Sequence, residues 1–222
     1  MEIYDGISID IETLGVNQHA AILQIGAVAF NYDEEIDESN PALNVKISVG
    51  DILKLSRRDI DPDTLQFWLY QDDDVKDEVF GFGNDGVVLV KALDELTRFM
   101  SPGISGFDYN SIWARGPVFD IGILENAYDQ MQLQHPWYKR FWMVRDLRTL
   151  EESVKLLYNV EAIAKDAYGL PHVAIDDAIS QAMQIQSLME VLKAASYQLD
   201  PSQIELDGPQ PKRSFLDKLL RR

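Results

Sequence analysis

The N-terminal part of the chain carries three stretches whose apolar and polar positions predict consecutive β-strands. Apolar and polar residues alternate over residues 4–13 and over residues 42–49, and residues 20–30 form an apolar run rich in Ile and Val. The acidic, polar residues 31–40 between the second and third stretches predict a loop or a hairpin tip. Three strands in immediate succession favour an antiparallel meander.

Helical spacing follows the third predicted strand. Asp61 and Pro62 signal a helix start, with Asp61 as N-cap and Pro62 at the first helical position. Strands come first and are then mixed with helices, which predicts an α/β fold with a mixed sheet. Four later segments repeat apolar residues at helical spacing: residues 86–100, 118–131, 149–158 and 175–197. Residues 72–78 predict a solvated acidic cluster. Residues 104–109 predict an edge strand, and residues 141–144 predict a final strand.

Length and composition fit one domain followed by a short tail. The chain has 222 residues, and 46% of them are hydrophobic, which is enough for a substantial core. Residues 1–198 are predicted to form the domain. Residues 199–211 contain three prolines and no periodicity, so they predict a linker. Residues 212–222 form a basic amphipathic tail that we expect to dock on a partner protein or on substrate; a disordered, solvated end is the alternative.

Composition also limits the cellular compartments and the binding partners that we expect for this chain. The chain has no Cys, which excludes a disulfide framework and a Cys-bearing zinc site and fits a reducing compartment. It shows neither a signal-peptide pattern nor an apolar run of membrane-spanning length, so we expect a cytoplasmic protein without membrane contact. The net charge of −17 argues against a broad nucleic-acid footprint, but cations bound to acidic residues invert the local field. A narrow site that grips few nucleotides stays possible.

Candidate chemistry begins with Asp10 and Glu12 at the end of the first predicted strand. Side chains alternate faces along a strand, so these two carboxylates leave the sheet on the same side. Adjacent like charges cost stability unless a cation lies between them, which points to a divalent metal; a strand end frayed into solvent is the alternative. Later in the chain, Asp120 lies at a helix start, and His172 precedes Asp177 on the first turns of the last long helix.

Taken together, these motifs carry a resemblance to a known family. The chain combines Asp10-Ile11-Glu12-Thr13-Leu14-Gly15, Phe119-Asp120 and an H-x-x-x-x-D motif over residues 172–177. In residue type, order and separation it resembles the DEDDh 3′-to-5′ exonucleases of the ribonuclease H-like fold. The W-x-R-G-x-x-F-D motif at residues 113–120 and the R-D-x-R-T motif at residues 145–149 look like segments of the DexA-type phage exodeoxyribonucleases and their bacterial relatives. The resemblance spans residues 4 to about 195.

This resemblance implies a ribonuclease H-like, mixed five-stranded sheet flanked by helices, with two Mg²⁺ or Mn²⁺ ions in the site. Asp10 would bridge the ions, Glu12 and Asp177 would hold the ion that carries the attacking water, and Asp120 would support the second ion. Hard oxygen ligands suit these metals, and the two ions stabilise the attacking and leaving oxygens of an in-line displacement. His172 would act as the general base, because neutral imidazole accepts a proton near pH 7.

Other residues leave two interpretations open. Thr13 and Leu14 resemble the family positions that hold the terminal nucleotide. Arg148 is a candidate phosphate contact, although a structural salt bridge explains it nearly as well, and Arg115 and Asp146 share that ambiguity. Trp68 could stack on a base, but the core is the favoured place for an aromatic residue on an amphipathic helix. Asp176 would lie about 100° around the helix from Asp177 and is interpreted as an outer acid.

The sequence therefore predicts a metal-dependent exonuclease that hydrolyses single-stranded DNA from its 3′ end to nucleoside 5′-monophosphates. The preference for DNA over RNA rests on the DexA-like segments. An exoribonuclease of the same fold is one alternative, and a catalytically silent module that binds a partner protein is another. The complete set of four acids and a histidine argues against the silent module.

Overall fold

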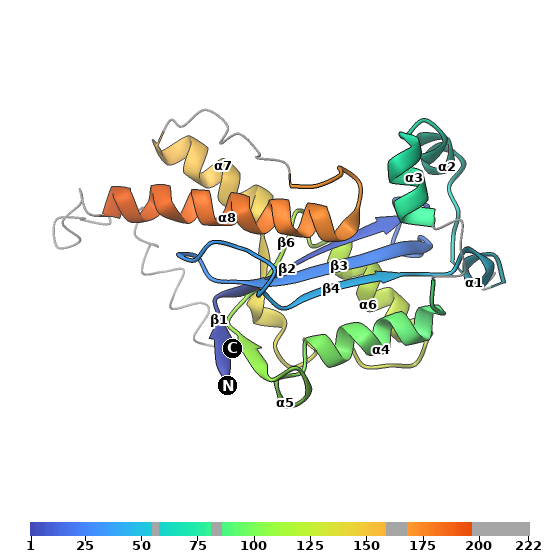
Figure 1. Ribbon diagram of the computed structural model, residues 1–222, viewed down its shortest axis with the longest axis horizontal. Helices are drawn as coiled ribbons and strands as arrows, with labels where there is room; N and C mark the ends of the chain where they lie inside the picture. The colour runs from blue at the N-terminus through green and yellow to red at the C-terminus, as the bar shows by residue number, and fades with distance from the viewer. Residues whose placement is uncertain (55–57, 81–85, 159–167, 197–222) are drawn as a thin grey trace, which may run out of the picture. The chain divides into compact units, whose positions relative to one another are not determined.

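The computed structural model describes residues 1–54, 58–80, 86–158 and 168–196, and it is built on the predicted five-stranded mixed sheet (Figure 1). The antiparallel meander consists of β2 (Gly6–Thr13), β3 (Ile22–Phe30) and β4 (Ala42–Lys46). Two parallel strands, β6 (Ile112–Ala114) and β7 (Val144–Asp146), extend it beyond β2, so the strand order is β4-β3-β2-β6-β7. A separate two-stranded sheet pairs β1 (Glu2–Tyr4) with β5 (Phe107–Tyr109).

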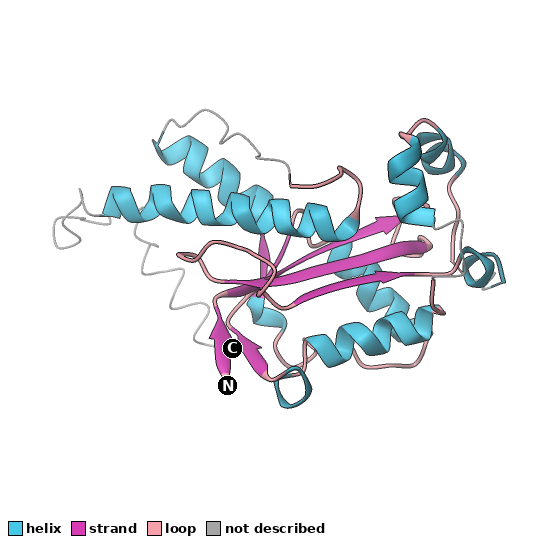
Figure 2. Ribbon diagram, in the orientation of Figure 1, coloured by secondary structure: helices cyan, strands magenta, loops and turns pink. Residues whose placement is uncertain are grey.

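Helices cover both faces of the large sheet (Figures 1 and 2). One face packs against α4 (Leu89–Phe99) and α6 (Asp120–Gln130), and the other lies under α7 (Leu147–Tyr158) and α8 (Ala174–Ser196). The side chains of Ile7, Ile9 and Ile11 are buried in the main core, as expected for the apolar face of the first long strand. Their alternation places Ser8, Asp10 and Glu12 on the face toward α8.

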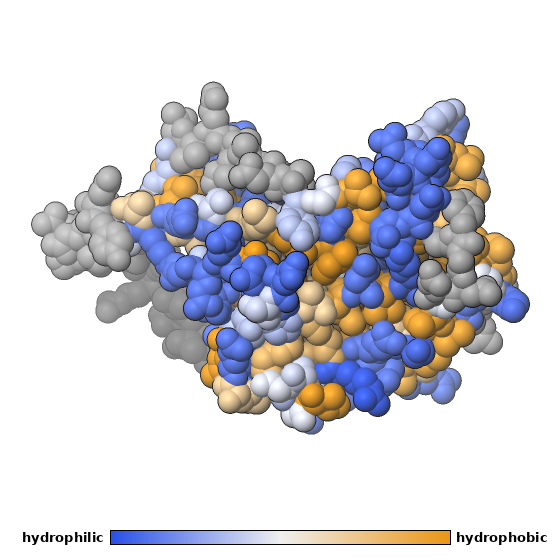
Figure 3. All heavy atoms as spheres, in the orientation of Figure 1, coloured by the Kyte–Doolittle hydropathy of each residue, from blue (hydrophilic) through white to orange (hydrophobic). Residues whose placement is uncertain are grey.

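Short helices follow the meander, and Asp61 caps one of them as predicted. The Asp61 carboxylate accepts hydrogen bonds from the backbone N–H groups of Asp63 and Thr64 at the start of α2 (Pro62–Leu69). The acidic cluster is solvated as predicted and forms α3 (Asp73–Phe80), in which Asp73, Asp74 and Asp77 are exposed while Val75 and Val79 are buried. Hydrophilic side chains gather over α3 in Figure 3.

The structure corrects several predicted boundaries, all in short segments. The first predicted strand divides into β1 and β2, and the third ends at Lys46 before α1 (Val49–Lys54). Residues 104–109 begin in α5 (Pro102–Ser105) and only then form β5, and the predicted strand at residues 141–144 is η1 (Phe141–Met143) followed by β7. The pattern missed β6 entirely. Three-residue strands are too short to show a period, so long-range pairing decides them.

The chain divides by its contacts into Met1–Met189, which carries the sheet, and Glu190–Arg222. Of the second unit, the structure describes residues 190–196, which form the end of α8. The predicted linker at residues 199–211 and the predicted tail at residues 212–222 lie outside the described residues. Among the described helices, none is long and apolar enough to span a membrane.

Candidate active site

Asp10 and Glu12 lie at the C-terminal end of β2 and project from the same face of the sheet, as predicted. In the antiparallel register, Asp10 faces Gly26 of β3 and Glu12 faces Gln24. A register irregularity follows directly between Glu12 and Thr13, where the ladder of β2 and β3 shifts. The two carboxylates are therefore the last regular residues of the strand on this face, at the point where the chain turns away.

Gly26 and Gln24 allow the start of α8 to approach this strand end. A Cβ atom on Gly26 would lie 2.2 Å from the carbonyl carbon and oxygen of Ala174, so a larger residue would push the helix away. The Gln24 side chain also accepts a hydrogen bond of 3.2 Å from the Ala174 N–H, which helps satisfy the helix N-terminus. A glycine and a glutamine on β3 thus set the position of the loop and helix that carry His172 and Asp177.

His172 and Asp177 are fixed relative to each other. The His172 N–H donates to the Asp177 carboxylate at 3.0 Å, and His172 adopts a left-handed backbone conformation with φ of 63°. Its ring lies edge-on to Phe67 of α2, with 5.1 Å between ring centroids, and 6.4 Å from the ring of Trp68. The imidazole therefore stands between the last long helix and α2, held by aromatic contacts.

Asp120 completes the predicted set from the first turn of α6, where it is buried. Asp10, Glu12, Asp120, His172 and Asp177 all line one cavity of about 370 Å³, although they come from three distant parts of the chain. Ligand atoms of Glu12, His172 and Asp177 lie within 4.8 Å of one another, close enough to hold one metal ion. Carboxylate and imidazole groups are both ligands of divalent cations in proteins.

Burial raises the pKa values of Asp10, Glu12 and Asp120 in this cavity, and repulsion from neighbouring carboxylates adds to the effect at Asp10 and Glu12. Desolvation is the largest cause for each. It acts with the charge of Asp177 and then Asp120 to raise the pKa of Glu12 to about 8. Desolvation likewise raises the pKa of Asp120 to about 7, against hydrogen bonds from the backbone of Ile11 and of Asp120 itself. The pKa of Asp10 is also raised well above its usual range, by burial first and then by the neighbouring carboxylates. Such a cluster favours a bound cation, because the cation offsets the repulsion between ionised acids.

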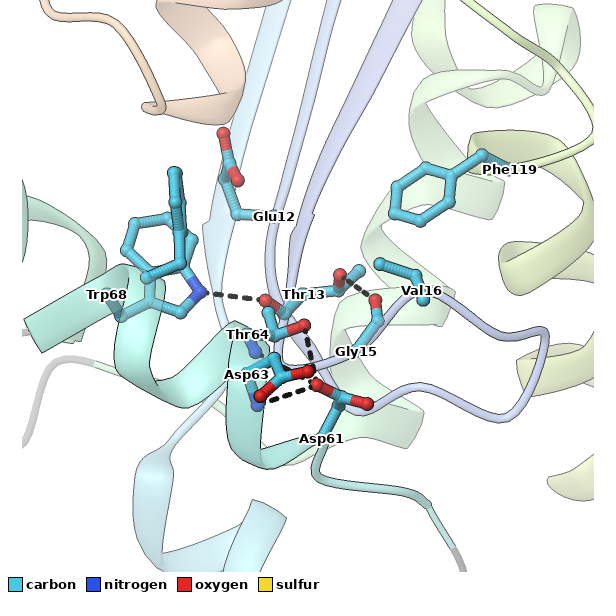
Figure 4. Close-up of a pocket in the computed structure, with 10 residues that line it drawn as sticks. Glu12, Thr13, Gly15, Val16, Asp61, Asp63, Thr64, Trp68 and Phe119 are labelled. Atoms are coloured by element: carbon cyan, nitrogen blue, oxygen red, sulfur yellow. Dashed lines mark hydrogen bonds between the residues drawn. The ribbon is translucent and has the colours of Figure 1, made fainter.

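A second pocket of about 460 Å³ adjoins the cavity and shares Glu12 and Phe119 with it (Figure 4). The N-terminal part of α2 forms one wall, and Thr13 and Val16 contribute from the turn after β2. The core prediction for Trp68 is correct, because the side chain is 2% exposed and its indole N–H donates to the Thr13 carbonyl at 2.8 Å. Trp68 nevertheless also lines this pocket.

The two residues expected to hold a terminal nucleotide are both buried, with 5% exposure each, but only Thr13 lines a pocket. Thr13 lines the second pocket, and its hydroxyl donates to the Gly15 carbonyl at 2.6 Å. Leu14 is buried, and its backbone N–H donates to the Ala21 carbonyl. The substrate contacts of both residues stay predictions.

Arg115 and Arg148 both line the cavity, and they differ in how firmly the fold holds them. Arg115 joins β6 to two helices, because its guanidinium donates to Glu151 of α7 at 2.9 Å and to Gln184 of α8 at 2.6 Å. Arg148 lines the cavity beside Gly116, so a role in phosphate binding stays open for it. Asp146 accepts hydrogen bonds from the Arg148 N–H and the Thr149 hydroxyl, which caps the start of α7.

Sequence reasoning missed Gln181, which donates a 2.7 Å hydrogen bond to Asp10 and lines the cavity. It lies four residues after Asp177 on α8, hence on the same helix face, and that spacing is the signal that could have identified it. The role of Asp176 as an outer acid is consistent with its contact, since its carboxylate accepts from the Leu170 N–H at 2.8 Å in the preceding loop.

Comparison with known proteins places this chain and its fold among the exonucleases. Residues 5–189 match the family described as the 3′-5′ exoribonuclease Rv2179c-like domain. The exodeoxyribonuclease of Enterobacteria phage T4 is 24% identical over 170 residues, which cover 67% of this chain and 71% of the phage enzyme.

Solved structures show the same architecture at low sequence identity. The nuclease domain of 3′hExo, a DEDDh family member bound to rAMP, has a TM-score of 0.53 at 15% identity, covering 84% of this chain and 92% of that domain. Pop2p of S. pombe, in its Mg²⁺- and Mn²⁺-bound form, has a TM-score of 0.53 at 13% identity over 84% of this chain and 83% of that one. The E. coli ExoI–ssDNA complex in its zinc-bound form has the same TM-score at 13% identity, covering 89% of this chain and 42% of that one.

At these identities the structural likeness establishes the fold, and the family match establishes the relationship. Because the match spans residues 5–189, this chain belongs to the 3′-5′ exoribonuclease Rv2179c-like domain family, and it has the ribonuclease H-like fold of the solved exonucleases.

Proposed function

We propose that this exonuclease uses two divalent cations, Mg²⁺ or Mn²⁺, to remove nucleoside 5′-monophosphates from the 3′ end of single-stranded nucleic acid, and that it prefers DNA to RNA. The observation that carries the proposal is the convergence of four carboxylates and His172 on one cavity. When bound, the cations would supply charge stabilisation at the scissile phosphate and favour ionisation of the attacking water. Asp10, Glu12, Asp120 and Asp177 are the residues that would hold them.

His172 is assigned the proton transfer. Its ring is oriented by the edge contact with Phe67 and by the backbone hydrogen bond to Asp177, so it can accept a proton from a water held between it and Glu12. His172 also lies within reach of a metal shared by Glu12 and Asp177, so ligation is the competing role. Metal affinity separates the two roles.

The second pocket supports cleavage at an end. It opens beside Glu12 and Thr13 and offers apolar surface from Val16, Phe67 and Phe119, which suits one terminal nucleotide with its base against apolar side chains. A duplex would have to melt before its last phosphate reached the acids. The acidic chain supplies little cationic surface to offset that cost.

The similar proteins support different nucleic acids as the substrate. Similarity to the phage T4 exodeoxyribonuclease supports DNA, whereas the family description names an exoribonuclease. The 2′-hydroxyl is the group that distinguishes the two at a given nucleotide. We keep DNA as the proposed substrate because the shared W-x-R-G-x-x-F-D and R-D-x-R-T segments resemble the phage enzymes. A cytoplasmic location is part of the same proposal.

The test compares kcat/KM on DNA and RNA single strands of matched sequence, each labelled at the 5′ end, with Mn²⁺ and with EDTA. We expect stepwise shortening from the 3′ end, dependence on the metal, and faster hydrolysis of DNA. A preference for RNA of about tenfold, or about 1.4 kcal/mol of transition-state binding, would reverse the substrate assignment and leave the nuclease chemistry in place.

If the chain were a catalytically silent module that binds a partner protein, its melting temperature would respond differently to Mn²⁺. An active metal site should raise the melting temperature in millimolar Mn²⁺, because ligand binding to the native state stabilises it. Neither hydrolysis nor a thermal shift would support the silent module instead.

A further inference from the structure

Two aromatic side chains lie exposed just before the edge strand β7. Phe141 is 69% exposed and Trp142 is 61% exposed, although large aromatic residues usually gain stability by burial. Their rings form an edge-to-face pair with 5.4 Å between centroids. Neither belongs to the main hydrophobic core, so the fold leaves these two rings for another role.

Positive charge is concentrated in the same segment. Residues 139–148 contain four cationic side chains and one acid, in a chain whose net charge is −17. The acid, Asp146, is engaged at the start of α7, and Arg140 is paired with Asp108 at 3.0 Å. Arg145 is exposed, and its guanidinium donates to the carbonyl of Trp142, which places this cation beside the aromatic pair. We call Phe141, Trp142 and Arg145 the basic aromatic strip.

The strip leads toward the catalytic cavity. Arg145 pairs in register with Trp113 of β6, which pairs with Ser8 of β2, so Arg145 projects from the same face of the sheet as Asp10. Two strand spacings and two residues along a strand put the Cα atom of Arg145 about 12 Å from that of Asp10. Arg148, three residues after Arg145, already lines the cavity.

The strip also lies where a substrate strand needs support. The cavity borders the second pocket through Glu12 and Phe119, and it reaches Arg148 beyond the end of β7. A terminal nucleotide in the second pocket would leave the preceding nucleotides to continue past Arg148 toward Arg145. Aromatic rings that stack on bases, combined with cations along the backbone, are the usual means of binding single strands without reading sequence.

We propose that the basic aromatic strip is a binding site for single-stranded nucleic acid upstream of the 3′ end, with bases stacked on Trp142 and Phe141 and a phosphate beside Arg145. This inference rests on the proposed function, because it assumes that a nucleic acid occupies the cavity. The strip holds a longer substrate in addition to its terminal nucleotide. It should therefore matter for an oligonucleotide of about twelve nucleotides and contribute little to a trinucleotide.

The kinetic test measures kcat/KM on 5′-labelled dT3 and dT12, since oligo-dT forms no hairpins. For the Phe141→Ala/Trp142→Ala double variant, we expect the loss on dT12 to exceed the loss on dT3 by about tenfold or more, from the usual value of base stacking. Arg145→Ala should reduce the salt dependence of kcat/KM on dT12, because one phosphate contact is lost. The controls are Leu156→Ala on α7, whose residue is 85% exposed, and Arg98→Ala on α4, both of which should treat the two substrates alike.

A binding test needs no hydrolysis. The chain has four Trp residues, and Trp68, Trp113 and Trp137 are buried, so Trp142 is the exposed fluorophore. In EDTA, dT12 should quench tryptophan fluorescence in the wild type. The Trp142→Phe variant should lose most of this quenching and keep only the part that a nucleotide in the second pocket causes at Trp68. It should keep most of its kcat/KM on dT12, because Phe still stacks.

Equal losses on dT3 and dT12, together with no quenching, would overturn the inference. If wild-type dimerisation were lost in the double variant without any length effect, the strip would be a contact between copies and the inference would also be wrong. Failure of the wild type to hydrolyse either oligonucleotide would instead refute the proposed function, and quenching by dT12 would still decide whether the strip binds a single strand.

Discussion

At the scale of single residues, burial raises the pKa values of Asp10, Glu12 and Asp120, so the folded chain disfavours their charged forms when no cation is present. The pKa values of Glu12 and Asp120, about 8 and about 7, lie above their ordinary values of 4.5 and 3.8. The folded chain therefore binds more protons than the unfolded chain between these limits. These two groups therefore contribute most to the free energy of unfolding at a pH below their ordinary pKa values. The contribution decreases as the pH rises toward their pKa values in the folded chain, about 8 for Glu12 and about 7 for Asp120.

Asp10→Asn tests this repulsion, because Asn keeps an oxygen that can accept from Gln181 while it removes the charge. In EDTA, the variant should melt at a higher temperature than the wild type, with a small difference near pH 5 and a larger one near pH 8. Hydrolysis should fall by about three or more powers of ten, since a metal-holding carboxylate is lost. Equal melting temperatures at pH 8, or turnover above about a tenth of the wild-type value, would contradict the metal-site assignment.

His172→Ala separates a general base from a metal ligand. Turnover should fall roughly 10²- to 10⁴-fold while Mn²⁺ affinity, measured by calorimetric titration, changes little. His172→Asn should behave in the same way. A large loss of Mn²⁺ affinity in both variants would make His172 a ligand that completes the group with Glu12 and Asp177.

Gln181→Leu tests whether the orientation of Asp10 matters. Gln181 is buried, and its 2.7 Å hydrogen bond restrains one carboxylate oxygen of Asp10, so its loss should lower Mn²⁺ affinity by about 10- to 100-fold. Gln186→Leu is the matched control on the same helix, because that side chain binds the backbone of Asn31 and Glu34 and lies outside the cavity lining. Equal Mn²⁺ affinities for the wild type and Gln181→Leu would mean that Gln181 fills space and does not position Asp10.

At the scale of elements, the contact between β3 and the start of α8 decides whether the late part of the chain reaches the first strand. Gly26→Ala would place a Cβ atom 2.2 Å from the Ala174 backbone, and backbone cannot rotate away as a flexible side chain can. We expect a loss of about 1 to 3 kcal/mol in the free energy of unfolding. Turnover of the remaining folded protein should also fall, because the displaced helix carries Asp177.

Gly103→Ala on α5 is the control, since nothing lies within 4 Å of its added Cβ. Denaturant unfolding and single-turnover hydrolysis measure the two effects. If Gly26→Ala matched Gly103→Ala in both, close packing at β3 would not position the site.

At the scale of the whole molecule, the predicted domain ends before the basic tail. Truncation after Asp207 should leave hydrolysis of a trinucleotide within about twofold of the full chain, because the cavity is lined entirely by residues 10–181. Binding of any protein partner through residues 212–222 should be lost, as a pull-down with the two forms would show. A collapse of trinucleotide hydrolysis would mean that the tail belongs to the catalytic unit.

The sequence by itself determined the chemistry and the outer frame of the fold. Asp10 and Glu12 share a face because strand side chains alternate, and Asp61 begins a helix because its carboxylate caps free N–H groups. Long periodic segments such as those that became β3 and α8 were recognisable for the same reason. Their structure follows from interactions between residues a few positions apart, which a sequence shows directly.

The tertiary structure alone decided which distant residues meet and what their charges become. β6 enters the middle of the sheet with three residues, and Gln181 reaches Asp10 across 171 positions of sequence. The sequence left a structural salt bridge open for Arg115, but only the structure identifies its partners as Glu151 and Gln184 on two helices. The pKa values of the acids also depend on burial by segments far away in the chain. Pairing, close approach and desolvation are long-range properties, so they arise only when the chain has folded.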